Sequence, residues 1–420
     1  MNDMKYSGYK WLGDIPKEWK VVKVKDVFYR KKAKAYQTDP VILSLARSGV
    51  KIRDISNNEG QIASSYFEYN PVSINDMLIN PMDLQSGANC SISLVEGVIS
   101  PAYINLRCKK DENPLFFDYY FKYQYWSYAF FAHGKGVSFE NRWTLNEDTL
   151  MNFPLICPSI FAQNRIALFL SDTSKKIDET LMLLERQINL LLEYKKSFIS
   201  EIVTKGLRSR EFKQSQKKYL GEVPSHWKIN KVKFYLRRRT IKNRPMLTVL
   251  SLYREYGVIP KDSRDDNHNV TAEDTSKYLV IRPGDFVINK MKAWQGSMAV
   301  SEYEGIISPA YYCFEFLDGT FNKKYFHYLM RNKKYIPEFR RLSAGIREGQ
   351  WDLSEDAFKN IYIVIPPIEE QDEIVEYLDK KCRQVDEIIE QKKKQISVLE
   401  EYKKSLIYEY VTGKKEVPNE

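Results

Sequence analysis

The chain is one sequence unit written twice, and this duplication limits its fold more than any other feature. Leu12–Pro16 (LGDIP) returns as Leu220–Pro224 (LGEVP), and Gly97–Tyr103 returns as Gly305–Tyr311. Both pairs are 208 positions apart, and further pairs as far as Val203-Thr204 and Val411-Thr412 keep this offset. The 420 residues are therefore expected to form two related units rather than one large core.

The first 150 or so residues of each copy contain short apolar runs bounded by Gly, Pro, Asn and Asp. Examples are Asp76–Asn80 and Pro283–Asn289. Such runs are typical of strands, and weaker helical stretches lie at Leu115–Phe131 and Phe321–Asn332. The pattern predicts two copies of an α/β (α+β) globular domain, at residues 1–158 and 209–366.

The rest of each copy, residues 159–208 and 367–420, is predicted to be a long helix. Spacings of four and three residues alternate along the positions Ile177, Leu181, Leu184, Ile188, Leu191, Lys195, Phe198 and Ile202, and again along Val385, Ile389, Lys392, Ile396, Leu399, Lys403, Leu406 and Tyr410. This seven-residue repeat indicates helices that pair along their length. Gly206 and Gly413 are expected to end them. An antiparallel coiled coil would relate the copies by a pseudo-twofold axis, giving a tandem repeat with two helical spacers.

Composition favours a polyanionic partner. The 65 Lys and Arg exceed the 55 Asp and Glu, for a net charge of +10. The five cysteines include no C-x-x-C pair, as expected of reduced thiols in a cytoplasmic protein without a metal site. No apolar segment long enough for a membrane span is present, and Met1–Lys10 lacks the apolar centre of a signal peptide.

A duplicated unit carried on paired helices fits the twofold symmetry of DNA. Two inverted domains held at a fixed separation can engage two half-sites on one duplex. The alternative is a coiled-coil scaffold with two protein-binding heads, and geometry alone does not decide between them.

The opening of each half, Leu-Gly-x-Ile/Val-Pro-x-x-Trp, resembles that of specificity subunits of type I restriction–modification enzymes. So does Ile365–Gln371 (IPPIEEQ), which leads into the helix that ends Tyr410–Lys414 (YVTGK). The first copy departs at Ser159–Gln163 and at Lys205-Gly206. The resemblance covers nearly the whole chain. It implies two target-recognition domains that read a bipartite, asymmetric DNA site. The implied partners are double-stranded DNA, two methyltransferase (modification) subunits and restriction/translocase subunits. S-adenosylmethionine, ATP and Mg would be used by those subunits.

The sequence shows no catalytic constellation of its own. The phosphate-binding pattern G-x-x-x-x-G-K-[ST] is missing. Asn80–Asp83 (NPMD) lacks the second proline and the aromatic residue of an adenine methyltransferase motif. The four histidines are isolated. We therefore expect a non-catalytic subunit with no cofactor or metal. The alternative hypothesis is a self-contained enzyme that methylates or cleaves DNA.

Basic runs fall at matching places in the two copies, Arg30-Lys31-Lys32 and Arg237-Arg238-Arg239. Such a run is usually a solvated surface. Because the run recurs in both copies, we weigh phosphate contact equally with a solvated surface for Arg30, Lys31, Arg238 and Arg239.

Base reading is expected where the copies differ, because two different half-sites need different side chains. Arg, Lys, Gln and Asn are the residue types that pair with base edges in the major groove. The first-domain candidates are Arg47, Lys51, Arg53, Gln85, Asn89, Lys135, Asn141 and Arg142. Those of the second domain are Arg254, Tyr256, Lys261, Arg264, Lys290, Lys292, Trp294, Gln295, Arg347 and Gln350. Trp143 and Trp351 recur at one offset and are interpreted as core residues.

Overall fold

The computed structural model describes residues 3–37, 39–55, 63, 65–82, 84, 89–109, 111–136, 143–208, 210–254, 256–264, 271–345 and 351–418. Contacts divide the chain into two compact units. The first unit contains Met1–Leu184 and Lys393–Glu420, and the second contains Glu185–Lys392. Each unit thus combines one globular domain with parts of both long helices.

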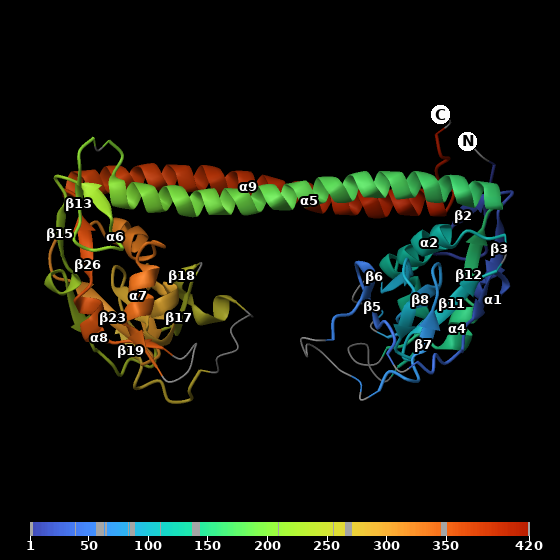
Figure 1. Cartoon of the computed structure of the whole chain (residues 1–420), viewed down its shortest axis with the longest axis horizontal. Helices are drawn as coiled ribbons and strands as arrows, with labels where there is room; N and C mark the ends of the chain where they lie inside the picture. The colour runs from blue at the N-terminus through green and yellow to red at the C-terminus, as the bar shows by residue number, and fades with distance from the viewer. Residues whose placement is uncertain are drawn as a thin grey trace. The chain divides into compact units, whose positions relative to one another are not determined.

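A four-stranded antiparallel sheet forms the centre of the first unit (Figure 1). Its strand order is β4 (Phe28–Arg30), β11 (Ile104–Cys108), β8 (Met77–Ile79) and β9 (Cys90–Ile92). Helix α2 (Pro114–Trp126) contacts β9, and the Asn113 side chain caps its start by accepting hydrogen bonds from two backbone N–H groups. The other elements are β1 (Met4–Tyr6), β2 (Asp14–Pro16), β3 (Lys20–Lys23), α1 (Val24–Val27), β5 (Leu43–Ala46), β6 (Gly49–Ile52), β7 (Asn70–Val72), β10 (Gly97–Ile99), α3 (Ala129–His133), α4 (Glu147–Met151) and β12 (Pro154–Cys157).

The second unit repeats this arrangement with the strand order β16 (Leu236–Arg239), β23 (Tyr311–Phe316), β20 (Phe286–Asn289) and β21 (Met298–Val300). Helix α6 (Lys323–Met330) takes the place of α2 and is capped by Asn322. The other elements are β13 (Phe212–Gln214), β14 (Glu222–Pro224), β15 (Lys228–Lys231), η1 (Val232–Phe234), β17 (Leu250–Tyr253), β18 (Gly257–Pro260), η2 (Lys261–Ser263), β19 (Leu279–Ile281), η3 (Lys290–Gln295), β22 (Gly305–Ile307), α7 (Ile336–Leu342), β24 (Ser343–Ala344), β25 (Asp352–Leu353), α8 (Glu355–Lys359) and β26 (Tyr362–Ile365). Two copies of a mixed α/β domain are therefore confirmed.

Both long helices are continuous. Helix α5 (Ile160–Lys205) has 46 residues and α9 (Ile368–Val411) has 44. Gly206 and Gly413 follow them in the left-handed conformation, with φ of 73° and 71°, which confirms the expected helix ends.

A buried glutamine fixes the start of each long helix. Gln163 Nε2 donates to the Pro158 carbonyl (3.0 Å), and its Oε1 accepts from the Asn113 backbone N–H (2.8 Å). Gln371 makes the same two bonds, to Pro366 (2.9 Å) and from Asn322 (2.9 Å). One side chain thus joins the long helix to the cap of α2 or α6. The first copy keeps these contacts although its Ser159–Gln163 segment departs from the family motif.

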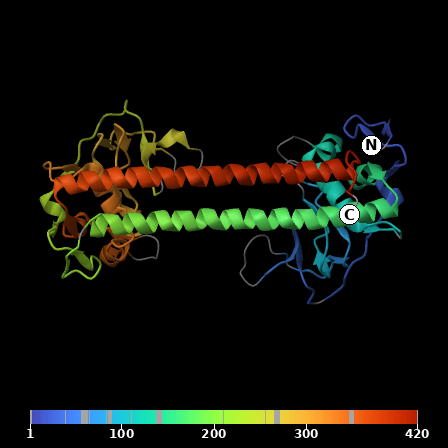
Figure 2. The same cartoon turned by 90° about the horizontal axis from the view of Figure 1, so that it is seen from above.

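In each unit, a segment of α5 lies antiparallel to a segment of α9 (Figures 1 and 2). In the first unit Lys403 Nζ contacts the Asp178 carboxylate at 2.6 Å, and in the second unit Lys195 Nζ contacts Asp386 at 2.6 Å. Ile177 and Val385 of the predicted apolar seam are buried. The antiparallel pairing predicted from the heptads is therefore present in both units.

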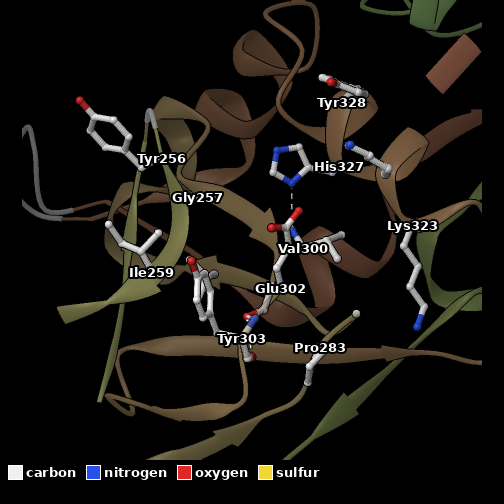
Figure 3. Close-up of a pocket in the computed structure, with 14 residues that line it drawn as sticks. Tyr256, Gly257, Ile259, Pro283, Val300, Glu302, Tyr303, Lys323, His327 and Tyr328 are labelled. Carbon is white, nitrogen blue, oxygen red and sulfur yellow. Dashed lines mark hydrogen bonds between the residues drawn. The ribbon is translucent and has the colours of Figure 1, made fainter. Parts of the chain in front are cut away.

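The free edge of each central sheet is closed by a side chain from the neighbouring helix. The Ile92 N–H of β9 donates to Asp118 of α2 at 3.0 Å. The equivalent Val300 N–H of β21 donates to Nδ1 of His327 of α6 at 3.2 Å (Figure 3). An edge N–H left without a partner would be costly to bury and prone to pair with another chain. The equivalent edge N–H groups are therefore satisfied by different residues in the two copies, Asp118 and His327.

His327 predicts an acid sensitivity of the second unit. Burial, and then the charges of Arg331 and Lys324, lower its pKa from 6.5 to about 3. The folded state therefore prefers neutral His327, and stability present above pH 6.5 should be lost as the pH falls towards 3. The loss from this group should reach at most about 1.4 kcal/mol per pH unit.

The measurement is urea unfolding of the full chain between pH 7 and pH 4.5, compared with His327→Asn. Asn offers an acceptor to the Val300 N–H without taking up a proton, so the variant should lose less stability on acidification. Equal pH dependence of the two proteins would contradict this role for His327.

Candidate nucleic-acid interface

The basic runs carry a duplicated set of internal contacts. Arg30 donates to the carbonyls of Asn105 (3.0 Å) and Tyr103 (3.3 Å). Arg238 donates to the equivalent carbonyls of Cys313 (3.1 Å) and Tyr311 (3.5 Å). A glutamate of the short helix α4 or α8 also faces each guanidinium group, at 3.6 Å and 3.5 Å. Burial lowers the pKa of both arginines. Each arginine thus ties an edge strand of the central sheet to its neighbouring strand.

The next residue in each run forms a buried ion pair. Lys31 contacts the Asp76 carboxylate at 2.8 Å, and Arg239 contacts Asp285 at 2.7 Å. Asp76 is fully buried and also forms an ion pair with Arg107 (2.6 Å). Both aspartates directly precede an inner strand of the central sheet of their unit, β8 or β20. These contacts give Lys31 and Arg239 a structural task, and phosphate binding by them stays a prediction.

The exposed members of the runs are Lys32 and Arg237. Lys32 pairs with Glu147 at 2.8 Å, and Arg237 pairs with Glu315 at 2.7 Å. The Arg237 side chain remains 68% exposed, which leaves it free to exchange this carboxylate for a phosphate.

In the second unit, four predicted base-reading residues gather on one surface. Arg254, at the turn after β17, donates to Gln295 of η3. Lys292 and Trp294 belong to the same short helix, and Lys292 is exposed. The sequence separates Arg254 from Gln295 by 41 residues, so the fold brings them together.

Trp294 continues this surface towards α7. Its ring lies 5.5 Å from that of Trp351, and the Arg340 guanidinium lies 5.5 Å from the Trp351 ring. Both tryptophans are half-buried, and Trp143 packs against the apolar core of the first unit. The core interpretation thus describes Trp143 better than Trp351. Arg340 escaped the sequence analysis because nothing in the sequence marks it as a neighbour of Trp351.

The remaining described candidates of the second unit make other contacts, and one of them, Lys290, begins η3. Arg264 stacks on Tyr256 at 4.4 Å, and Lys261 bonds to Thr271. Lys290 and Arg238 each lie 4.7 Å from the ring of Tyr312, a contact that no motif indicated. Tyr256 also borders a cavity of about 600 Å³ between the β17–β18 hairpin and α6 (Figure 3).

In the first unit the candidates are less concentrated. Arg47, Lys51 and Arg53 lie on or beside the β5–β6 hairpin, and the first two are exposed. Lys135 is exposed and pairs through its backbone with Thr144. Asn89 is buried, which does not favour base contact. Gln85, Asn141, Arg142, Arg347 and Gln350 lie outside the described residues.

Within the ranges that the structure describes, no group of three His, Cys, Asp or Glu residues is placed to hold a metal ion. None of the helices among those residues is long and apolar enough to cross a membrane.

The fold and this surface define a duplicated protein of two mixed α/β units with long paired helices and basic, aromatic faces. Residues 239–398 match the family described as the type I restriction modification DNA specificity domain. The chain is 24% identical to the MjaVIII type I restriction enzyme specificity subunit of Methanocaldococcus jannaschii, over 96% of this chain and 95% of that protein. It is 23% identical to the putative MjaX specificity subunit of the same organism, over 65% and 62% of the two chains.

Solved structures agree with this fold. The crystal structure of the HsdS subunit from Thermoanaerobacter tengcongensis aligns over 98% of this chain and all of that chain, with a TM-score of 0.51 and 15% identity. A chain from a type I R-M system, studied for complex assembly and conformational transition, aligns over 94% and 98%, with a TM-score of 0.67 and 14% identity. The resemblance seen in the sequence is confirmed: residues 239–398 match the DNA specificity domain of type I restriction–modification enzymes, and nearly the whole chain is similar to their specificity subunits.

The contacts of the basic run predict different roles for neighbouring arginines. Arg239→Ala leaves the Asp285 charge buried without its partner and should destabilise the second unit by about 3–5 kcal/mol. Arg237→Ala removes an exposed ion pair and should cost less than about 1 kcal/mol. Urea unfolding of the full chain measures both. Similar losses for the two variants would rule out the structural role of Arg239.

Proposed function

We propose that this specificity subunit is non-catalytic and reads a bipartite, asymmetric DNA site, with one half-site assigned to each unit. One observation supports this proposal: the two units share the same framework but expose different side chains. The Arg30 and Arg238 contacts are equivalent, and Arg47 and Arg254 stand at the same place after β5 and β17. The hairpins differ beyond that point, because the turn after β17 carries Tyr256 and because Lys51 of β6 stands where β18 has Ile259. Different side chains on one framework suit two different short sequences.

The proposal assigns the chemistry to other subunits. Two methyltransferase subunits would bind this chain and use S-adenosylmethionine, and restriction/translocase subunits would use ATP and Mg. The family resemblance supports these partners, and the chain's own residues would supply DNA recognition and assembly. A cytoplasmic location belongs to the same proposal and agrees with the five free cysteines.

The decisive experiment is to map methylated adenines in DNA treated with the chain and its methyltransferase subunit. An asymmetric site with two defined halves and a fixed spacer is the expected result. Methylation by the purified chain and S-adenosylmethionine alone would overturn the assignment of catalysis to the partners.

Matched pairs of substitutions should act on one half-site each. Arg254→Ala with Gln295→Ala should relax the half read by the second unit, and Arg47→Ala with Lys51→Ala should relax the other. A lost base contact costs about 1–3 kcal/mol of discrimination, which is roughly 5- to 150-fold. The measurement is methylation of a library randomised at each target position. Relaxation of both halves by one pair of substitutions would contradict the assignment of one half to each unit.

Exposed Arg237 should contact phosphate rather than bases. Arg237→Ala should weaken specific and non-specific binding alike, and the slope of log K against log salt should fall by about 0.9. An unchanged slope in salt titrations of the full complex would show that Arg237 makes no phosphate contact and is an ordinary solvated surface residue.

The paired helices should set the spacer between half-sites. Deleting Ile188–Tyr194 together with Ile396–Tyr402 removes one heptad from each helix. The deletion spares Lys195 and Asp386, and Asp178 and Lys403. About 10 Å would be lost at 1.5 Å per residue, or about 3 bp. DNA bending can absorb part of this, so the preferred spacer should shorten by about one to three base pairs.

Methylation of targets that differ only in spacer length measures the preference. The half-site sequences serve as the internal control, because they should not change. A folded variant that binds its partners and keeps the original spacer would refute the role of the helices as a ruler.

A further inference from the structure

The helix that covers the central sheet carries two residues, one turn apart, that differ between the units. In α2 they are Asp118 and Lys122, whose side chains form an ion pair at 2.6 Å. The equivalent positions 209 residues later hold His327 of α6 and Arg331, which caps that helix and donates its N–H to the His327 carbonyl at 3.3 Å. Asp118 and His327 both accept an N–H from the free edge of the sheet. The two units therefore close this edge alike, but only the first does so with a charge.

The charge of the edge acceptor determines what the basic residue one turn later can bind. Asp118 is a carboxylate and holds the Lys122 ammonium group on the same helix. His327 accepts through Nδ1, so this nitrogen carries no proton and the ring is neutral. A neutral ring cannot form an ion pair with Arg331, whose guanidinium group bonds to other segments of the unit.

Arg331 joins the two segments whose side chains meet on the proposed base-reading surface. Its Nη1 donates to the Met298 carbonyl of β21 at 3.0 Å, and its Nη2 donates to the Arg254 carbonyl in the turn after β17. Strand β21 follows η3, which carries Gln295, and the Gln295 side chain accepts from Arg254. A guanidinium group is a planar donor fork, so its two bonds fix the separation of the carbonyls that it binds. The fork therefore sets how the turn after β17 lies relative to η3.

The bond to this turn matters because a cavity of about 600 Å³ separates the β17–β18 hairpin from α6 (Figure 3). The lining of the cavity includes Gly257 and Val258 of the hairpin and His327 and Tyr328 of α6. Arg331 is half-buried, and burial lowers its pKa. Hydrogen bonds from a cation that is partly removed from water are stronger than those made on an open surface. Arg331 can therefore hold the hairpin in place where helix and hairpin are not packed together.

We propose that Arg331 is a positioning residue for DNA recognition by the second unit, and that the neutral His327 ring, in place of a carboxylate, directs its guanidinium group to the turn after β17. Arg331 acts through Arg254 and Gln295, whose side chains the proposed function assigns to base reading, so the inference rests on that assignment. It adds a residue that affects one half-site only, because the first unit has an ion pair in the same place.

The test replaces His327 by two residues that differ in charge but hardly in shape. Aspartate and asparagine can each accept the edge N–H that His327 accepts now. His327→Asp also places a carboxylate one turn before Arg331, which is the arrangement of the ion pair in α2. The guanidinium group should move to that carboxylate, because a carboxylate is a stronger acceptor than a neutral carbonyl. His327→Asn should leave it on the Arg254 carbonyl.

Methylation of a library randomised at each target position, by the full chain with its methyltransferase subunit, measures the effect. His327→Asp should lower discrimination in the half-site of the second unit by about 5- to 150-fold, as the loss of one base contact would. His327→Asn should keep the original preference in both halves. If His327 served only to close the sheet edge, the two variants would behave alike. The half-site of the first unit is the internal control and should not change.

A second variant keeps the test decisive if His327→Asp folds poorly, which urea unfolding of each variant reveals. Arg331→Lys keeps the charge but replaces the fork by one ammonium group, which cannot hold two carbonyls in fixed positions. It should relax the same half-site as His327→Asp. The matched control in the first unit is Lys122→Arg, which keeps the ion pair with Asp118 and should change neither half-site.

Three results would overturn the inference. His327→Asp and His327→Asn could show the same base preference, both halves could relax together, or Arg331→Lys could keep the original specificity. The proposed function has a separate check, because Arg254→Ala with Gln295→Ala must relax the half-site of the second unit. If that pair has no effect, the assignment of base reading fails, and the positioning role fails with it. If the pair relaxes the half-site and His327→Asp does not, only the positioning role fails.

Discussion

Each unit depends on the end of a helix that begins in the other copy of the repeat. Val411, at the end of α9, is fully buried in the core of the first unit with Ile166 and Leu170 of α5. Val203, at the end of α5, is fully buried in the core of the second unit, where its carbonyl accepts from Tyr325 at 3.0 Å. Because burying one such side chain contributes about 1.5–3 kcal/mol, neither globular domain has a complete core without the other copy's helix. The long helices are thus part of the domains that they connect.

The sequence was sufficient to predict the parts of this fold that are written as periodic patterns. The 208-residue offset indicated two related units, the heptads indicated paired helices, and Gly206 and Gly413 marked their ends. The roles of individual charged residues could not be predicted in the same way. The partner of Lys31 lies 45 residues away and that of Arg239 lies 46 residues away, so only the folded sheet reveals that these cations are paired internally. A basic run has the same appearance in a sequence whether it faces phosphate or a buried aspartate.

The surroundings of Trp351 could not be predicted from the sequence either. Its recurrence at the position of Trp143 suggested a core residue, since duplicated cores usually keep their large side chains. The surroundings of the two positions have diverged: Trp143 donates from Nε1 to the Phe131 carbonyl at 2.8 Å, whereas Trp351 packs against Trp294. A residue retained by duplication can therefore pack against the core in one copy and against another half-buried aromatic side chain in the other. A residue that recurs in both copies marks equivalent positions, but its structural role depends on how it packs in each unit.

The separation of framework residues from exposed residues explains how one framework could carry the two recognition surfaces that we propose. The Arg30 and Arg238 contacts, the Asp76 and Asp285 ion pairs and the Gln163 and Gln371 bonds hold strands and helices in place, and they recur in both units. The Arg254–Gln295 contact and the Trp294–Trp351 pair belong to the second unit and lie outside that set. Substitutions on the β17 turn or on η3 leave the buried ion pairs untouched, so the residues that we propose to read bases can change at little cost in stability. Changes at Asp285 would disturb the sheet from which those segments extend. Recognition can therefore diverge quickly only where the duplicated framework does not need the residue.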